Sequence, residues 1–248
     1  RGLATARDAW CYNSSSESLN ANIKRSMDFY NDQRYQLSKG FIKDVEYDLT
    51  QISWTTSVLN LALKNQEITQ DKIGEKVISL YRPFFKQIGY YSRFWNERVY
   101  QLPKLFPTSK YKKLVICVKG IGDKDFSCLI ADCMPDLQVI FNGQCFPLYW
   151  YEENKNKQQT LSLFDTESSD DYIRRDGITD WILKEVRTRF GNARKITKET
   201  IFYYVYGLLH SPKYREAFAA DLKKSLPRIP IVEDIDAFLD FSLSLIHI

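Results

Sequence analysis

The sequence predicts an α+β fold, in which a mixed or mostly antiparallel central sheet is flanked by N-terminal and C-terminal helices. Three observations support this class. Apolar residues recur at helical spacing near both ends of the chain. Short apolar bursts separated by turn dipeptides fill the middle. The chain has 248 residues and 44% hydrophobic content, so it can bury a core. We treat residues 1–248 as one domain with four parts.

Residues 1–76 form the first part, which we expect to be mostly helical. Three serines precede Glu17, and this pattern is typical of a helix start. Four apolar residues then follow at helical spacing, namely Leu19, Ile23, Met27 and Tyr30. We expect this helix to end near residues 31–32. Residues 45–56 have a shorter, β-like pattern, and residues 57–66 suit a second helix.

Residues 77–151 form the second part, which is β-rich. Residues 77–95 are rich in aromatic and β-branched side chains and are interrupted by Pro83 and Gly89. Residues 112–151 then give short apolar bursts, with turn signals at residues 120–123, 134–136 and 142–143. Bursts of this kind predict the strands of a mostly antiparallel sheet.

The last two parts are a polar stretch and a helical segment. Residues 152–172 are polar and predict an exposed loop. Residues 173–248 should contain a helix at about residues 178–191 that ends at Gly191. A second helix should begin at a capping box from Thr197 to Thr200. A third should follow the N-cap Ser211 with Pro212 in its first position, and a last helix should cover about residues 236–246.

The composition excludes several classes of protein. The longest aliphatic run, residues 114–118, is far shorter than the roughly 20 residues of a membrane-spanning helix, and no signal peptide opens the chain. Five cysteines without a close pair indicate a reducing compartment, and hence the cytoplasm. Two distant histidines argue against a zinc site. Because the chain begins with Arg1 and stops within an apolar pattern, we expect it to be a piece of a longer protein.

Familiar catalytic and nucleotide-binding motifs are missing from the sequence. There is no phosphate-binding loop of the Walker type, no Gly-x-Ser-x-Gly elbow and no Pro-Pro turn of the kind that holds the target amine in amino-methyltransferases. Gly120 and Gly122 follow an expected strand, but Asp125 replaces the third glycine of a dinucleotide-binding fingerprint. We therefore expect a tight hairpin loop there, and we predict neither a catalytic residue nor a metal site.

A metal-dependent nuclease is one alternative. Asp136, which follows a proline, combines with Glu153 and Lys155 to match a loose nuclease motif. In such a site two carboxylates hold Mg²⁺ and a lysine stabilises the attacking water. The site would require Asp136 and Glu153 on neighbouring strands. Glu153 instead opens the polar stretch, so a turn and a solvated loop are the simpler interpretation.

Cations interleaved with aromatic residues are the main functional signal that composition gives. Residues 1–120 contain 19 Lys and Arg against 11 Asp and Glu, whereas residues 121–248 contain 16 against 20. A basic half suits a polyanion, because Lys and Arg neutralise phosphates and Arg reads guanine in the major groove. The same pattern also fits an aromatic core whose outer face is solvated by cations. The candidate DNA-binding residues are Arg82, Lys86, Arg93, Arg98, Lys104, Lys112, Lys113, Lys119, Lys155 and Lys157.

Residues 204–230 carry the most specific signal. Their sequence, YVYGLLHSPKYREAFAADLKKSLPRIP, resembles a signature near the C-terminus of type ISP restriction–modification enzymes. Further passages are similar to the same family in the same order, namely TARDAWCYN (residues 5–13), NIKRSMDFYN (residues 22–31), YRPFFKQIGYY (residues 81–91) and FSCLIADCMPDLQVIFNGQCFPLY (residues 126–149). The final SLIHI is also similar to the family's last helix, so the resemblance spans nearly the whole chain.

The resemblance implies a function. These enzymes join a nuclease, a helicase-like ATPase motor, an N6-adenine methyltransferase and a C-terminal target recognition domain in one polypeptide, and this chain resembles the last part. The implied role is to read a short asymmetric site in double-stranded DNA beside the methyltransferase domain of the parent chain, with no catalysis and no membrane contact of its own. The parent would use S-adenosylmethionine, ATP and Mg²⁺, whereas no cofactor is expected in this fragment. The remaining alternative is a module that docks on the methyltransferase without touching DNA.

A signature shared by enzymes that read different DNA sequences should be scaffold rather than a set of base contacts. We therefore expect core packing for Phe202, Tyr203, Tyr206 and Leu209. His210 should be a structural hydrogen-bond partner, and Arg82 should brace a turn or contact phosphate. Base-reading residues are expected in residues 86–119 and 152–172.

Overall fold

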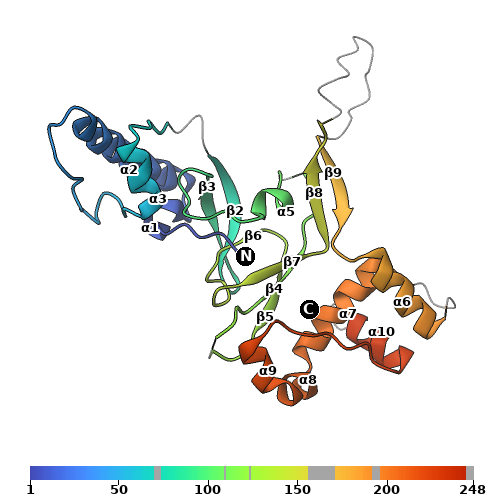
Figure 1. Cartoon of the computed structure of the whole chain (residues 1–248). Coiled ribbons are helices and arrows are strands. Elements are labelled where there is room, and N and C mark those ends of the chain that lie inside the picture. Colours follow the sequence, from blue (N-terminus) through green and yellow to red (C-terminus); the bar gives the residue numbers. More distant parts are fainter. Residues whose placement is uncertain (70–73, 109, 123, 156–170, 192–195, 244–248) are drawn as a thin grey trace, which may run out of the picture. The chain divides into compact units, whose positions relative to one another are not determined.

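The computed structural model describes residues 1–69, 74–108, 110–122, 124–155, 171–191 and 196–243 (Figure 1). Helices at both ends of the chain flank a middle region of short strands with mostly antiparallel pairing, so the predicted α+β class is confirmed. The described strands form three sheets rather than one central sheet. The chain divides into two compact units. The boundaries expected near residues 76, 151 and 172 rest on composition and stay a prediction.

The first compact unit, which we call the hairpin unit, consists of Gly2–Tyr100 and Cys133–Val139. Its helices are α1 (Asp8–Cys11), α2 (Ser16–Ser38) and α3 (Thr56–Leu63). Its strands are β1 (Tyr12–Asn13), β2 (Glu75–Arg82), β3 (Phe85–Tyr91) and β6 (Met134–Pro135). They form a sheet of order β1-β3-β2-β6, in which β6 runs parallel to β2 and the other pairs are antiparallel. This sheet therefore joins residues 133–139 to the N-terminal region.

Helix α2 supplies much of the hydrophobic core of the hairpin unit. The hydroxyl of Ser15 caps the helix by accepting a hydrogen bond from the N–H of Ser18 at 3.2 Å. The four apolar residues predicted to share one face are all buried, namely Leu19, Ile23, Met27 and Tyr30. Figure 1 shows α2 and α3 side by side, and their buried residues pack in one cluster with Trp95. The predicted helical spacing is confirmed.

Helix α2 is longer than the sequence predicted. It was expected to end near residues 31–32, but it continues to Ser38. The Asn31 side chain explains the difference, because it bonds both the N–H and the carbonyl of Ile68, at 3.1 and 2.6 Å, instead of ending its own helix. The chain leaves the helical path at Gly40, whose φ of +72° favours glycine.

Residues 45–56 form no strand, so the β-like interpretation of this segment is wrong. The Asp48 carboxylate accepts a hydrogen bond from the N–H of Thr50 at 2.8 Å and closes a local turn. The Trp54 indole donates to the carbonyl of Glu46 at 2.8 Å. Ile52 is fully buried although it does not lie in a strand, so the β-like pattern reflects the burial of a loop residue. The helix expected at residues 57–66 is present as α3.

The second compact unit, which we call the ribbon unit, consists of Gln101–Asp132 and Ile140–Ile248, together with Arg1. Its strands are β4 (Val115–Val118), β5 (Cys128–Ala131), β7 (Gln144–Pro147), β8 (Tyr149–Glu153) and β9 (Tyr172–Asp176). They form an antiparallel sheet of order β5-β4-β7 and an antiparallel ribbon of β8 and β9. Its helices are α5 (Leu102–Leu105), α6 (Asp180–Phe190), α7 (Lys198–His210), α8 (Pro212–Ala217), α9 (Ala219–Lys224) and α10 (Ile235–Leu243).

Helix α7 is the centre of the ribbon unit. Thr197 and Thr200 form the predicted capping box at its start. Tyr204 stacks on Phe238 of α10 with ring centroids 4.2 Å apart, and Figure 1 shows the two helices side by side. The predicted core packing is confirmed, because Phe202, Tyr206 and Leu209 are buried. Tyr203 is partly buried and packs against the same cluster. This part of the signature is scaffold.

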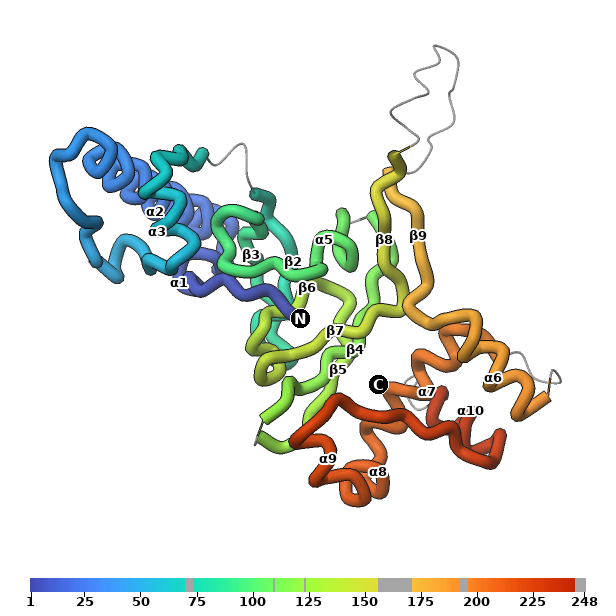
Figure 2. The backbone as a smooth tube through the Cα atoms, viewed as in Figure 1, coloured from blue at the N-terminus to red at the C-terminus, as the bar shows by residue number. Residues whose placement is uncertain are grey.

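The chain after α9 returns along α7 as an extended segment (Figure 2). The hydroxyl of Tyr204 donates to the carbonyl of Pro230 at 2.5 Å. The hydroxyl of Tyr214 donates to the carbonyl of Arg228 at 2.8 Å. The tyrosines and both carbonyls belong to residues 204–230, so this signature segment holds its own two ends together.

The remaining C-terminal helices differ from the prediction in their bounds. Helix α6 ends at Gly191, as predicted, with a φ of +75°. Residues 211–226 form two helices instead of one, because the backbone leaves the helical region at Phe218 (φ −112°, ψ 17°). The last helix, α10, ends at Leu243, and residues 244–248 lie outside the described residues. No helix in the described ranges is long and apolar enough to cross a membrane.

The middle of the chain also departs from the prediction at three points. Strands β4 and β5 pair as an antiparallel hairpin, but residues 119–127 separate them, so the loop is longer than the tight one predicted at Gly120 and Gly122. The short helix α5 lies within the part that was expected to be β-rich. The polar stretch contains strand at both ends, because Glu153 at the end of β8 pairs with Tyr172 of β9. The interpretation of Glu153 as the start of an exposed loop is therefore wrong. Residues 156–170, including Lys157, lie outside the described residues.

Gly177, which connects β9 to α6, is expected to tolerate no side chain. A Cβ atom at this position would overlap the carbonyl oxygen of Pro147. Gly177→Ala should therefore lower the free energy of unfolding by about 3 kcal/mol, measured by urea unfolding. The matched control is Gly40→Ala, where nothing lies within 4 Å and the positive φ alone should cost about 1 kcal/mol. Equal losses in the two variants would contradict this account.

Candidate nucleic-acid interface

The β8–β9 ribbon presents two faces of different character. Register pairs Trp150 with Arg175 and Glu152 with Ile173 on one face. The opposite face carries Tyr149 and Tyr151, which are buried. On the first face the Nε of Arg175 donates to a Glu152 carboxylate oxygen at 3.0 Å. The Lys104 ammonium lies 5.8 Å from the centre of the Trp150 ring. We call this set, Trp150, Glu152, Ile173, Arg175 and Lys104, the ribbon face. Trp150 and Glu152 are half-buried, and the other three are exposed.

Lys112 belongs to a network at the base of the ribbon. Its ammonium lies 2.9 Å from a carboxylate oxygen of Glu199 at the start of α7. The Tyr149 hydroxyl donates to the same oxygen at 2.6 Å. These two donors lower the pKa of Glu199, so the carboxylate stays ionised. Arg174 also lies over Tyr149, with its guanidinium carbon 4.5 Å from the ring centre.

The other predicted cations of the ribbon unit have different environments. Lys155 is exposed just beyond β8, and Lys113 is half-buried. Lys119 has only 4% exposure and donates to the carbonyl of Gly122 at 2.6 Å. Its ammonium therefore closes the loop after β4 and is turned away from solvent.

The predicted cations of the hairpin unit lie on or after the β2–β3 hairpin. Lys86, Arg93 and Arg98 are exposed. The backbone of Arg98 pairs with that of Ala4 through two hydrogen bonds of 3.0 Å, which fixes where its side chain begins. These three residues lie at the surface of this unit, whereas Arg82 is half-buried and is held by neighbouring side chains.

Arg82 joins three of the signature segments. Its guanidinium contacts Asp136 at 3.1 Å and Asp8 at 3.3 Å. It also stacks over the Tyr81 ring, with 3.8 Å between the guanidinium carbon and the ring centre. The Tyr12 hydroxyl donates to the second oxygen of Asp136 at 3.0 Å. The prediction that Arg82 braces the fold agrees with these contacts.

The Asp136 carboxylate is nearly fully buried, with 3% exposure. Burial is the main cause that raises its pKa, to about 6, and nearby Asp8 acts in the same direction. The N–H of Gln138, which donates at 2.8 Å, together with Tyr12 and Arg82, opposes this shift. Burial and the Asp136 charge also raise the pKa of Tyr12.

These contacts leave the nuclease motif without a free carboxylate at Asp136, because both oxygens accept hydrogen bonds from the protein. Asp136 belongs to the hairpin unit, whereas Glu153 and Lys155 belong to the ribbon unit. Within the part of the chain that the structure describes, no group of three or more His, Cys, Asp or Glu side chains is arranged to hold a metal ion.

His210 bonds to Cys128 and Arg215 at the end of α7. Its Nε2 lies 3.2 Å from the Cys128 Sγ, and its Nδ1 lies 3.3 Å from an Arg215 nitrogen. Because arginine can only donate, Nδ1 accepts and Nε2 carries the proton that faces the thiol. Burial, and then the Arg215 charge, lowers the pKa of His210. A neutral histidine with this tautomer cannot take the thiol proton, so the trio connects β5 to α7 and α8 as structure.

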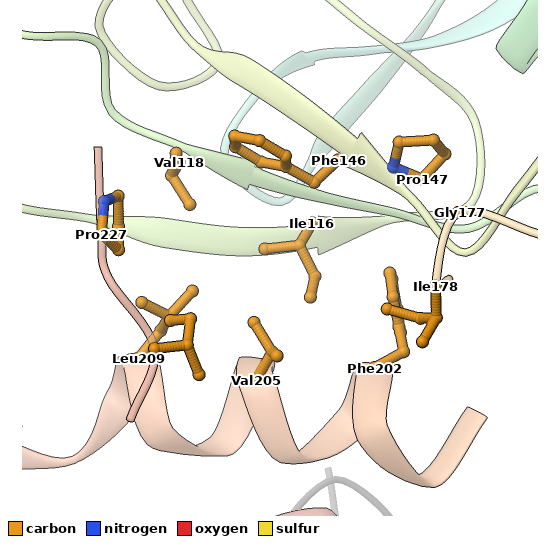
Figure 3. Close-up of a pocket in the computed structure, with 11 residues that line it drawn as sticks. Ile116, Val118, Phe146, Pro147, Gly177, Ile178, Phe202, Val205, Leu209 and Pro227 are labelled. Atoms are coloured by element: carbon orange, nitrogen blue, oxygen red, sulfur yellow. The ribbon is translucent and has the colours of Figure 1, made fainter. Parts of the chain in front are cut away.

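An apolar cavity of about 260 Å³ lies between the β4–β7 sheet and α7. Figure 3 shows Phe202, Val205 and Leu209 pointing from the helix towards Ile116 on the sheet. Apart from Gly177, all its lining residues that the structure describes have apolar side chains. The cavity therefore offers neither a titratable group nor a hydrogen-bonding side chain to a reactant.

Sequence reasoning missed Arg174, Arg175 and Trp150 as members of this interface. Trp150 precedes the polar stretch in the sequence, and the two arginines follow it. They come close together because β8 pairs with β9. The alternation of Tyr149, Trp150 and Tyr151 was the signal for a strand with one apolar and one amphipathic face.

Comparisons with known proteins give a consistent result. The family model described as the Type ISP C-terminal specificity domain matches residues 1–243. The ATP-dependent Type ISP restriction-modification enzyme LlaBIII bound to DNA is 30% identical with a TM-score of 0.79, and the match covers 98% of this chain and 15% of that chain. The DrdV–DNA complex is 29% identical with a TM-score of 0.81, covering 98% and 22%.

A third similar structure is a nuclease-deletion mutant of the Type ISP restriction-modification enzyme LlaGI in complex with a DNA substrate mimic. It is 30% identical with a TM-score of 0.77, and the match covers 98% of this chain and 21% of that chain. The chain thus spans 15–22% of the length of these three relatives. No curated protein is a significant match to the sequence.

The raised pKa of Asp136 predicts a specific pH dependence of stability. Its folded-state pKa of about 6 exceeds the ordinary value of 3.8, so as pH falls the folded state binds the proton first. The contribution of this group to the free energy of unfolding should therefore be lowest above pH 6 and rise by about 1–3 kcal/mol towards pH 4. Urea unfolding of the wild type and Asp136→Asn across this range measures the difference. Parallel pH profiles of the two proteins would refute the assignment.

Proposed function

The chain belongs to the Type ISP C-terminal specificity domain family, and we propose that it recognises a short sequence in double-stranded DNA for a longer restriction–modification enzyme. The single observation that carries the proposal is the similarity of 98% of the chain to three solved relatives whose structures contain DNA or a DNA substrate mimic. We place the domain in the cytoplasm, together with the double-stranded DNA that it would recognise.

The ribbon face is the proposed base-reading surface. A two-stranded β-ribbon fits the major groove of B-DNA, where each base pair presents a distinct pattern of donors and acceptors. Arg175 supplies a guanidinium that can bond guanine, and Glu152 can accept from cytosine. Ile173 offers an apolar contact for a thymine methyl group. The face thus carries hydrogen-bonding and apolar groups within two short strands.

Phosphate contacts are proposed for exposed cations near these elements. In the ribbon unit they are Lys104, Lys112 and Lys155, and in the hairpin unit they are Lys86, Arg93 and Arg98. Each neutralised phosphate releases counterions, so binding should weaken steeply as salt rises. We leave out Lys119, because its ammonium bonds a loop carbonyl, and Lys157, which lies outside the described residues.

The rest of the proposed parent enzyme performs the chemistry. An adenine methyltransferase using S-adenosylmethionine would modify the selected site, and an ATP-driven motor with a Mg²⁺-dependent nuclease would cleave DNA that lacks the modification. No catalytic step is assigned to this chain. The contacts of Asp136 and His210 support this division, because both side chains are held by partners within the protein.

Exchange of this domain between two enzymes should change the DNA sequence that the recipient enzyme recognises. Residues 1–243 replace the matching segment of LlaBIII, and the modified adenines are mapped by sequencing. The chimera should modify a new site and leave the original site unmodified, because the bases are read by the exchanged segment. The matched control is the same chimera with its ribbon face altered by Arg175→Ala and Trp150→Ala, which should lose the new specificity. Modification of the original LlaBIII site by the chimera would overturn the proposal.

Charge removal on the ribbon face should weaken DNA binding in two distinguishable ways. Lys104→Ala should reduce the slope of log affinity against log salt by about 0.9, as expected for one phosphate contact. Arg175→Ala should relax the preference at one base pair by about 1–3 kcal/mol, because it reads a base edge. Fluorescence anisotropy with duplexes selected from a random library measures both. Lys24→Ala, an exposed lysine paired with Asp28 on α2, is the control and should change neither quantity.

A further inference from the structure

The tip of the β2–β3 hairpin exposes three apolar residues, Pro83, Phe84 and Phe85, which we call the hairpin tip. Phe84 is 100% exposed and Phe85 is 48% exposed. Pro83 and Phe84 form a two-residue loop, because the flanking residues Arg82 and Phe85 are paired in register. A fully exposed phenylalanine contributes no packing to the hairpin unit, so the fold itself gives no reason for this side chain.

The backbone of Phe84 is unfavourable for a phenylalanine. Its φ is +61°, in the left-handed region that glycine and asparagine adopt at lower energy. This strain therefore presents an aromatic ring to solvent at the outermost point of the loop. A strained residue without internal contacts is a reason to look for a function in binding.

The hairpin below the tip is held firmly. Seven paired positions join β2 to β3. Arg82, the residue before the tip, is fixed by Asp8, Asp136 and the Tyr81 ring. Phe84 thus projects from a braced support, and its position does not depend on a flexible loop.

One exposed cation, Lys86, follows the tip on β3 and suits a polyanion. Arg82, on the other side of the tip, is already paired with Asp8 and Asp136. A protein partner would require about 20–30 residues on each side of a stable interface, far more than the three residues of this tip. A single step between base pairs is an apolar slot of the matching size, flanked by phosphates that Lys86 can neutralise.

We propose that Phe84 is a wedge that enters the minor groove of the bound duplex and inserts between two adjacent base pairs. This inference rests on the proposed DNA-binding function and adds a site and a mode of contact to it. Insertion partly unstacks one base step and bends the duplex away from the hairpin. Lys86, exposed on β3 beside the tip, would accompany the ring by neutralising an adjacent phosphate.

The test uses the full 248-residue chain and a duplex that the wild type has selected from a random library. The duplex carries 2-aminopurine at successive positions, because its fluorescence rises where stacking is lost. A donor and an acceptor dye at the ends report bending. The variants are Phe84→Ala, Phe84→Gly and Phe84→Trp, with Phe41→Ala as the matched control. Phe41 is another phenylalanine of the hairpin unit with 72% exposure.

The wild type should raise the fluorescence at one base step and shorten the end-to-end distance. Phe84→Ala and Phe84→Gly should abolish both signals and weaken binding by about tenfold, as expected for a lost base–aromatic stack. Their melting temperatures should be equal to or above that of the wild type, because no packing is removed and glycine suits the positive φ. Phe84→Trp should retain both signals, and Phe41→Ala should match the wild type.

The possible failures are distinct. If the wild type binds DNA and Phe84→Ala changes neither the affinity nor the fluorescence, the wedge is overturned and the proposed DNA-binding function is retained. Failure of the wild type to bind any duplex overturns the proposed function and the wedge together. In a third outcome the wild type sediments as a dimer, Phe84→Ala sediments as a monomer, and DNA binding is unchanged. That result assigns the tip to contact with a second copy of the chain and also overturns the wedge.

Discussion

Burial of the Asp136 carboxylate is the constraint on which the hairpin unit depends. A buried charge is costly unless it is paired and fully hydrogen-bonded. Three separate segments meet this requirement, because Tyr12 comes from β1, Arg82 from β2 and the N–H of Gln138 from the turn after β6. The short parallel strand β6, only two residues long, is thereby fixed against β2. The same arginine braces the hairpin that carries Phe84, so one buried carboxylate determines both the sheet and the position of an exposed ring.

In the ribbon unit, tyrosine hydroxyls stabilise the fold by bonding backbone carbonyls. A buried tyrosine needs a partner for its hydroxyl, and here the partners are backbone carbonyls that no strand satisfies. Tyr204 and Tyr214 bond the extended chain after α9, and Tyr151 bonds the carbonyl of Lys112 at 2.5 Å. Phenylalanine would give similar apolar burial but would leave these carbonyls unpaired. The tyrosines therefore position loops and strands around α7 as well as filling the core.

Local features of this fold could be predicted from the sequence, and pairings between distant segments could not. The spacing of Leu19, Ile23, Met27 and Tyr30 and the capping box at Thr197 depend on neighbours within a few residues, and both were predicted correctly. The extension of α2 depends on Asn31 meeting Ile68, and the division of the strands into three sheets depends on which strands pair. The candidate site divides in the same way. Arg82 was expected to brace a turn or contact phosphate, because it lies in a signature segment, and its contacts with Asp8 and Asp136 agree with the first of these roles. Arg174 and Arg175 were missed, because only the pairing with β8 brings them beside Trp150.

The separation of braced and exposed cations has a consequence for how such a domain can change its target. Arg7, Arg82 and Arg215 spend their donors on protein carbonyls, carboxylates and a thiol, so replacing any of them would leave a polar group without its partner. Arg93, Arg98 and Lys104 are exposed, and surface substitutions usually alter stability by no more than about 0.5 kcal/mol. The DNA contacts proposed for the second group could therefore be altered without disturbing the core that the first group stabilises. Phe84 departs from this rule, since it is exposed but strained. Its side chain can be exchanged without loss of packing, yet its backbone geometry favours glycine, so packing within the described fold does not account for a ring at this position.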